Sequence, residues 1–422
     1  MTILELKIDD IGAQGDGIAH HGNATIFVGG TLTGERVRIN LDDSKNVVKR
    51  AELLDVLIAS SWRVTPPCPH FGKCGGCRFQ HMNDEAYSNF KLEQLQITFA
   101  KAGLDVPCFL PAVTTATATR RRARITAHHT AKGILIGFNE WRSHAIIDVQ
   151  ECPILKSSLV DLIRKLRVVL PLWLNVGQRC DIQMTILPSG IDLVLIGGPA
   201  LGLSQRQALA EIAQRLNIAH LSWKKLDRSP AEPIVHQSPL SITFGNTSVN
   251  FPPGGFLQAS ETGEAALIEF TKNAYNPGDK VLDLYCGLGT FGLSMPNPEK
   301  VHFVDLDGPA IGALGHEIKR NGRYEVSLRN LNGDPCTAVE CNDYTFVIFD
   351  PPRGGAQAQA KQLAQSDVPR IVAISCDPES FARDAKILIE GGYCLESILP
   401  VDQFLWSPHL ECAAKFTKKV VV

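Results

Sequence analysis

Residues 280–292 read KVLDLYCGLGTFG, and this stretch decides the fold of the C-terminal part of the chain. An apolar run typical of a buried strand ends at Tyr285, and Gly287, Gly289 and Gly292 then follow with the spacing G-x-G-x-x-G. Such glycines let the main chain approach a ligand closely. In open α/β sheets, ligands bind beyond the carboxyl ends of the strands. We therefore expect a cofactor at this loop, with a tight turn that binds nothing as the alternative.

Four more apolar runs follow, separated by helix-like segments: KVHFVD (300–305), YTFVIFD (344–350), RIVAIS (370–375) and CLESILP (394–400). This alternation predicts βαβ units and a Rossmann-like, doubly wound α/β domain over residues 251–422. Asp305 ends the second strand at about the distance where dinucleotide folds place a ribose-binding acid. These features fit NAD as well as S-adenosylmethionine.

Two further strand ends bring reactive side chains to the same edge of the predicted sheet. Asp350 opens the stretch DPPRGG, and Cys376 follows a strand in SCDP. A hydride-transferring enzyme has no need of a cysteine there, whereas a base-modifying methyltransferase gains a nucleophile that faces its methyl donor. The alternative is that Cys376 is a small buried apolar residue, as most free cysteines are. Its place between a strand and a proline turn favours the functional interpretation.

The upstream sequence predicts two more domains, as the length of 422 residues leads us to expect. Residues 1–60 carry short β-rich runs broken by glycine turns, which predict a small β-barrel. Residues 61–250 contain a cysteine-bearing loop, an amphipathic helix over about 84–103, and mixed strands and helices. We expect an α/β middle domain there.

The composition limits the classes of function. A net charge of -2 excludes a polycation, so any RNA-binding surface must be local. No apolar run reaches membrane-spanning length and no secretion signal opens the chain, so we expect a cytoplasmic protein; without any sign of an obligate protein partner, we expect a monomer. The basic residues that could follow an RNA backbone are Arg120, Arg121, Arg122, Arg124, Lys49, Arg50, Lys73 and Arg78.

Twelve cysteines in a chain expected in a reducing compartment indicate metal or catalytic roles more than disulfides. Cys68, Cys74 and Cys77 have the spacing C-x5-C-x2-C, and Cys152 stands in ECPIL. Four thiolates suit either zinc or an iron-sulfur cluster, and the spacing leaves both open. The C-x3-C-x2-C pattern of radical enzymes is absent, so radical chemistry is not predicted.

Ordered motifs along the whole chain resemble the RNA uracil-5-methyltransferase family, most closely its longer members that act on 23S ribosomal RNA. They are GDGIAHHGNATIFVGGTLTGERV (15–37), CPHFGKCGGCRFQHM (68–82), TRRRARI (119–125), LIGFNEWRSHAIIDVQECPIL (135–155), GGFLQAS (254–260), DLYCGLGTF (283–291), FDPPRGG (349–355), SCDPESFARD (375–384) and HLE (409–411). The nucleophile motif has SCDP where the family more often has SCNP, and HLECAAKF replaces a more aliphatic run.

The resemblance implies an N-terminal TRAM domain, which is an OB-like RNA-binding barrel, an α/β middle domain with a [4Fe-4S] cluster, and a class I methyltransferase domain that uses S-adenosylmethionine. It makes Cys376 the nucleophile and Glu411 the general base. Without the motif, Glu411 would be taken for a solvated surface acid. The implied cluster ligands are Cys68, Cys74, Cys77 and Cys152, and the implied cofactor contacts are Gln258, Tyr285, Thr290, Asp305, Asp350 and, more weakly, Asp334.

The implied reaction forms 5-methyluridine through addition of Cys376 to C6 of uracil and removal of the C5 proton by Glu411. Arg353 and Arg383 are candidates for stabilising the thiolate. The substrate implied is 23S ribosomal RNA, with the T-loop uridine of transfer RNA as the alternative. A catalytically degenerate RNA-binding module and a nicotinamide-dependent oxidoreductase are the alternatives from other classes.

Overall fold

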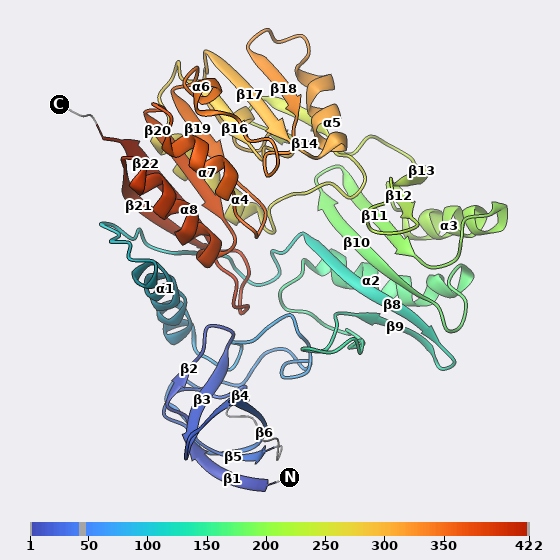
Figure 1. Ribbon diagram of the computed structural model, residues 1–422. Helices are drawn as coiled ribbons and strands as arrows, with labels where there is room; N and C mark the ends of the chain where they lie inside the picture. The colour runs from blue at the N-terminus through green and yellow to red at the C-terminus, as the bar shows by residue number, and fades with distance from the viewer. Residues whose placement is uncertain (1, 42–47, 420–422) are drawn as a thin grey trace.

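A computed structural model of the protein describes residues 2–41 and 48–419. Figure 1 shows three parts in chain order: a small N-terminal sheet, a middle α/β part and a larger C-terminal sheet covered by helices. Among the described helices, none combines the length and apolar character needed to cross a bilayer.

The N-terminal part is one six-stranded sheet that coils around a small apolar core. Its strands are β1 (Thr2–Lys7), β2 (Asp10–Ile11), β3 (Asp16–His21), β4 (Ala24–Gly29), β5 (Arg36–Leu41) and β6 (Val48–Ile58), in the order β1-β5-β6-β4-β3-β2. Alternate residues such as Ile26, Val28, Val37 and Ile39 point into that core. The described pairings leave β1 and β2 as the edges, so closure into an OB-like barrel stays a prediction.

The middle part is a second six-stranded sheet, in the order β13-β12-β11-β10-β8-β9, with two helices packed against it. The elements are β8 (Arg122–Thr130), β9 (Gly133–Gly137), α2 (Ser157–Val169), η1 (Leu170–Leu172), β10 (Arg179–Leu187), β11 (Gly190–Gly197), α3 (Leu203–Leu216), β12 (His220–Lys224) and β13 (Glu232–His236). Leu159, Ile163 and Leu166, at helical spacing on α2, meet Ile182 and Met184 of β10 in one core. The expected α/β middle part is confirmed.

The C-terminal sheet has the order β18-β17-β16-β19-β20-β22-β21-β7, in which β7 is Val113–Thr114, while β14 and β15 form a separate two-stranded sheet. The elements are β14 (Ser241–Phe244), β15 (Thr247–Asn250), α4 (Glu261–Ala274), β16 (Lys280–Leu284), η2 (Gly292–Ser294), β17 (Lys300–Asp305), α5 (Gly308–Ile318), β18 (Tyr324–Leu328), α6 (Ala338–Cys341), β19 (Phe346–Phe349), α7 (Gln357–Ala364), β20 (Arg370–Ser375), α8 (Pro378–Glu390), β21 (Tyr393–Asp402) and β22 (Glu411–Lys418). The five strands from β18 to β20 are parallel, while β22 is antiparallel to β20.

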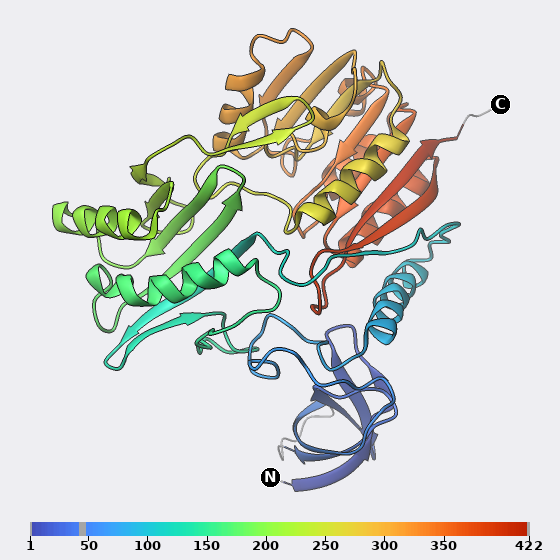
Figure 2. The same ribbon diagram turned by 180° about the vertical axis from the view of Figure 1, so that it is seen from behind.

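Helices cover both faces of this sheet, as the doubly wound prediction requires. Helices α7 and α8 lie in front of it in Figure 1, and α4, in yellow, lies in front of it in Figure 2, which shows the opposite side. Neighbouring residues of one strand enter opposite cores: Val281 packs with α4 and α5, whereas Leu282 packs with α7 and α8. The parallel strands therefore end at one edge, where the predicted site residues stand.

Two segments from the predicted middle domain pack against the C-terminal sheet. Helix α1 (Asp84–Lys101) places Phe99 edge-on against Phe381 of α8, with ring centroids 5.7 Å apart. Strand β7 (Val113–Thr114) pairs in parallel with β21. The domain limits at residues 60 and 250 stay predictions, but these two segments share the C-terminal core.

Candidate active site

A cavity of about 770 Å³ opens at the carboxyl ends of the parallel strands. The predicted residues that line it are Gln258, Tyr285, Thr290, Asp305, Asp350, Cys376 and Glu411. They come from the segment before α4, the ends of β16, β17, β19 and β20, and the start of β22. One cavity thus brings together almost all the side chains that the sequence proposes for cofactor binding and catalysis.

The glycine loop after β16 has the backbone geometry that a close approach to a ligand requires. Tyr285 adopts a left-handed φ of 58°, which is costly for a residue with a side chain and is found chiefly at functional sites. Asp305 accepts a hydrogen bond from Gly287 N at 2.8 Å and so fixes the loop. A Cβ on Gly292 would lie 2.5 Å from the Phe303 ring, so only glycine fits there.

Asp334 is the predicted cofactor residue that does not line the cavity. It is exposed and forms an ion pair with Arg329 at 3.0 Å. Its neighbour Asn332 lines the cavity instead and accepts a hydrogen bond from the Tyr285 hydroxyl at 3.3 Å. Asn332 and Asp334 belong to one short stretch, Asn332-Gly333-Asp334. The sequence alone does not show which of these side chains faces the pocket.

Glu411 is buried, with 3% of its surface exposed, so the alternative of a solvated surface acid is wrong. Burial and the nearby Asp350 carboxylate together raise the pKa of Glu411 to about 8, although a hydrogen bond from Gln403 lowers it. Burial likewise raises the pKa of Asp350 to about 7, against a hydrogen bond from Gln258. Two carboxyl groups whose pKa values lie near neutral pH therefore line one cavity, and such groups suit acid-base chemistry.

Gln403 is a polar residue of the site that the sequence did not reveal. Its Nε2 donates to Glu411 Oε2 at 2.9 Å and to Gln258 Oε1 at 2.7 Å. Gln258 Nε2 in turn donates to Asp350 Oδ2 at 3.0 Å. A chain of side-chain amides therefore joins the two buried carboxyls, and no motif marks the position of Gln403.

Cys376 lies between this cavity and a second one of about 430 Å³, and it lines both. Burial raises the pKa of its thiol to about 12, and the carboxylates of Glu411 and Asp350 add to the effect, whereas Arg353 lowers the pKa. Arg383 is engaged elsewhere, because it donates to Asp384 at 2.8 Å. Of the two predicted arginines, Arg353 is the one that acts on the thiol.

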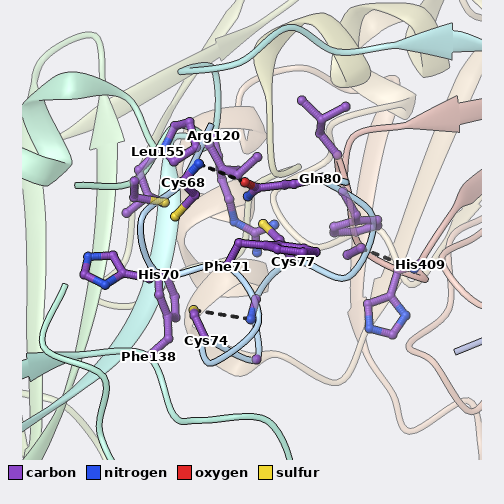
Figure 3. A pocket seen from close by; sticks show the side chains of 18 of the residues that line it. Cys68, His70, Phe71, Cys74, Cys77, Gln80, Arg120, Phe138, Leu155 and His409 are labelled. Atoms are coloured by element: carbon purple, nitrogen blue, oxygen red, sulfur yellow. Dashed lines mark hydrogen bonds between the residues drawn. The ribbon is translucent and has the colours of Figure 1, made fainter. Parts of the chain in front are cut away.

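The second cavity is lined by all four cysteines of the predicted metal set. Figure 3 shows Cys68, Cys74 and Cys77 around one space, and Cys152 completes the set. Burial, together with negative charge on the other three cysteines, raises the pKa of Cys77 to about 12. In the part of the chain that the structure describes, no three Cys, His, Asp or Glu side chains converge closely enough to hold one metal ion.

The predicted basic run at residues 120–124 does not form an exposed patch. Arg121 is 2% exposed and donates to Glu264 Oε2 at 2.6 Å. Arg122 stacks on the Phe256 ring at 4.5 Å, and Arg124 is bound by Asp181 and by a second aspartate. The expectation of RNA contact is therefore wrong for Arg121, because this side chain is buried and its charge is paired with Glu264.

A different group of arginines meets at the joint between the N-terminal sheet and the middle part. Asp16, nearly buried, accepts from Arg78 and Arg50 at 2.5 Å each, and Arg142 lies 3.9 Å away. The Trp141 ring is flanked by Arg78 at 4.1 Å and by Arg142 at 5.2 Å. One carboxylate thus faces three guanidinium groups, and Arg50 and Arg142 remain about half exposed.

Known families and proteins with similar sequences are RNA methyltransferases. The sequence profile of the tRNA (Uracil-5-)-methyltransferase family matches residues 205–419, and that of the TRAM domain matches residues 2–54. An RNA methyltransferase of Brucella suis biovar 1 is 39% identical over 418 residues, which cover 98% of each chain. The 23S rRNA (uracil(1939)-C(5))-methyltransferase of Photorhabdus laumondii is 29% identical, covering 99% of this chain and 97% of that protein.

A solved structure shares the fold of nearly the whole chain. The tRNA (uracil-54, C5)-methyltransferase of Pyrococcus abyssi, in complex with S-adenosyl-L-homocysteine, superimposes with a TM-score of 0.75 at 22% identity and covers 98% of this chain and 99% of its own. The expected methyltransferase fold and N-terminal TRAM domain are confirmed. The chain belongs to the tRNA (Uracil-5-)-methyltransferase family of S-adenosylmethionine-dependent RNA uracil-C5 methyltransferases.

Proposed function

We propose that the protein forms 5-methyluridine in 23S ribosomal RNA, with Cys376 as the nucleophile and Glu411 as the general base. The observation that carries the proposal is that both side chains line the cavity formed by the glycine loop and Asp350. The choice of 23S ribosomal RNA is supported by the name of the Photorhabdus relative, which aligns over almost the full length of both chains. The alternative, the T-loop uridine of transfer RNA, is supported by the name of the matching family and by the Pyrococcus neighbour.

In the proposed site, S-adenosylmethionine supplies the methyl group and is held beyond β16. The residues that would hold it line this cavity: Gln258, Tyr285, Thr290, Asp305, Asp350 and, in place of the predicted Asp334, Asn332. The cavity fits a nucleoside-sized ligand, because a glycine loop approaches it on one side and carboxylate and amide groups line the other.

The protein's own part in the reaction is covalent and acid-base chemistry on the uracil ring. The Cys376 thiolate adds to C6, which gives C5 the carbanion character that methylation requires. After methylation, Glu411 takes the proton from C5, the electrons re-form the C5–C6 double bond, and the Cys376 thiolate leaves. The target base must be flipped out or lie in a loop, because a stacked base cannot reach both groups.

Ionisation of Cys376 is the difficult step for this pocket, since its burial and two nearby carboxylates oppose a thiolate. The proposed role of Arg353 is to supply the compensating positive charge. A substrate that displaces water and leaves Asp350 protonated assists the same ionisation. The raised pKa of Asp350, about 7, makes this protonation accessible near neutral pH.

We further propose that the cysteine-lined cavity holds a [4Fe-4S] cluster. The support is the family resemblance and the fact that the four cysteines, Cys68, Cys74, Cys77 and Cys152, line one cavity. Because partial burial raises the pKa of Cys74, Cys77 and Cys152, a bound positive centre would be needed for these three thiols to ionise together. A [4Fe-4S] cluster and a tetrahedral zinc ion both take four cysteine thiolates, and the family resemblance is what favours the cluster here.

For the RNA backbone, we propose contacts at Arg50 and Arg142 in place of the buried Arg121. These two guanidinium groups are partly exposed and share Asp16 with Arg78, so positive charge remains for a phosphate.

Two variants test the catalytic proposal, and mass spectrometry of RNA from a deletion strain tests the substrate. Cys376→Ala should abolish methyl transfer, whereas Glu411→Gln should methylate the RNA and then remain attached to it as an adduct stable on a denaturing gel. Full activity of Cys376→Ala would contradict the proposal, and tight RNA binding without any methylation by the unaltered protein would favour a degenerate binding module. Loss of 5-methyluridine from transfer RNA, with 23S ribosomal RNA unchanged, would favour the alternative substrate.

A further inference from the structure

Gln403 occupies a fully buried position between the proposed general base and the cofactor pocket. It follows β21, is 2% exposed, and lies eight residues before Glu411. Both hydrogens of its amide are used, one by Glu411 Oε2 at 2.9 Å and one by Gln258 Oε1 at 2.7 Å. Its Oε1 accepts from Ala259 N at 3.0 Å. Every hydrogen-bonding atom of this amide therefore has a partner inside the site.

These contacts allow only one orientation of the Gln403 amide. If the amide were turned over, its oxygen would face the Glu411 carboxylate and the Gln258 carbonyl oxygen, and its NH₂ group would face the Ala259 N–H. All three contacts would become repulsive or unpaired, which is costly in a buried position. Gln403 is therefore a fixed donor to Glu411 rather than an adaptable polar neighbour.

The surroundings of Gln403 hold it in this place. Gly263, in the first turn of α4, packs against it, because a Cβ at Gly263 would lie 3.0 Å from both Cβ and Oε1 of Gln403. Arg121 donates from Nε to the Gln258 carbonyl at 3.1 Å and from its main chain to the Ala259 carbonyl at 3.0 Å. The segment that receives Gln403 is thus itself fixed from the middle part of the molecule.

We propose that Gln403 is a positioning residue that holds Oε2 of Glu411 and leaves Oε1 as the atom that takes the C5 proton. The proposal rests on the proposed role of Glu411 as general base. Among the described residues, none donates a hydrogen bond to Oε1 of Glu411, whereas Oε2 of Glu411 accepts one from Gln403. Through Gln258, the same amide ties the base to Asp350 in the cofactor pocket, so the base and the methyl-donor site keep a fixed mutual position.

The consequence is confined to one step of the reaction. Methylation of C5 needs Cys376 and the methyl donor, but release of the product needs Glu411 in reach of the C5 proton. Removal of the Gln403 donors should leave the adduct able to form and slow its breakdown. A hydrogen bond to a charged group is strong enough for a loss of roughly 10- to 100-fold in the rate of release.

The test compares Gln403→Leu, Glu411→Gln and the double variant, with 23S ribosomal RNA from the deletion strain as the substrate. Three quantities are measured: the single-turnover rate of methyl transfer, the rate of adduct release on denaturing gels, and the affinity for S-adenosylhomocysteine. We expect Gln403→Leu to slow release by roughly 10- to 100-fold, whereas methyl transfer and S-adenosylhomocysteine affinity, which depend on Gln403 only through Gln258, should change much less. In the Glu411→Gln background, Gln403→Leu should slow release no further, because its effect acts through Glu411.

Thr271→Val is the matched control, since it removes a buried hydrogen bond from α4 of the same domain, outside the site; its release should be that of the unaltered protein. If Gln403→Leu does not fold, Gln403→Asn keeps the amide but withdraws it by one methylene, and it should slow release in the same way. Release at the unaltered rate in either folded variant, or an additive effect in the double variant, overturns the role of Gln403. Normal release by Glu411→Gln would instead overturn the base assignment, so the two failures are distinguishable.

Discussion

Arg121 donates a hydrogen bond to Glu264 Oε2 at 2.6 Å, and the two side chains form a nearly buried ion pair between the middle part and α4. Removal of one partner leaves the other charge buried without compensation. Arg121→Met should therefore lower the free energy of unfolding by about 3 to 5 kcal/mol in chemical denaturation. The double variant Arg121→Met/Glu264→Leu should recover much of that loss. An effect no larger than that of Arg206→Met, an exposed arginine on α3, would contradict this prediction.

The Arg121–Glu264 ion pair is an example of a contact that could not be predicted from the sequence. The glycine loop and the strand ends at Asp305, Asp350 and Cys376 are local patterns, and the fold brings them to one cavity as predicted. The partner of Arg121 stands 143 residues away in the chain, so a run of arginines looks like a solvated patch until the fold is known. For the same reason neither the packing of α1 on the C-terminal sheet nor the amide of Gln403 had a local signal.

Asp283 gives the stability of the protein a dependence on pH. It lies in β16, 1% exposed, and burial raises its pKa to about 8, against a hydrogen bond from Gly292 N. An unfolded aspartate ionises near pH 4. Between about pH 4 and 8 the folded protein therefore keeps a proton that the unfolded chain loses, and rising pH favours unfolding. Asp283→Asn removes this titration, so the fall in unfolding free energy from pH 5 to pH 8.5 should be smaller than in the unaltered protein. Parallel pH profiles of the two proteins would contradict the assignment.

The exposed guanidinium groups of Arg50 and Arg142 should appear in the salt dependence of RNA binding. The logarithm of the RNA association constant falls linearly with the logarithm of the salt concentration. If each arginine contacts one phosphate of a single-stranded segment, this slope should become less steep by about 1.4 in the variant Arg50→Gln/Arg142→Gln. The methylation rate at saturating RNA should change little, because neither residue lines the active-site cavity. Arg206→Gln, an equally exposed arginine paired with Glu232, serves as the control. An unchanged slope in the double variant would exclude this surface from RNA contact.

If the cysteine-lined cavity holds a [4Fe-4S] cluster, the purified protein should contain iron. Protein purified without oxygen should be brown and carry about four iron atoms per chain, as a [4Fe-4S] cluster requires. Cys77→Ser should lose most of the iron, whereas Cys394→Ser, at an exposed cysteine of β21, should keep it. A colourless protein with one zinc per chain would contradict the cluster and favour the alternative that the spacing left open.

Release of the RNA product should depend on the ionisation of Glu411. The base must be unprotonated to accept the C5 proton, and burial raises the pKa of Glu411 to about 8. The rate of adduct release should therefore rise between pH 6 and pH 8 and level off above, because a larger fraction of Glu411 is then ionised. The Cys376 thiol, whose pKa is raised to about 12, titrates in the addition step, and in the release step it is only the leaving group. A pulse of adduct formed at one pH and chased at pH values from 6 to 9 separates these steps. In Glu411→Gln the slow residual release should lose this dependence on pH, and a profile that stays flat in the unaltered protein would show that another group takes the proton.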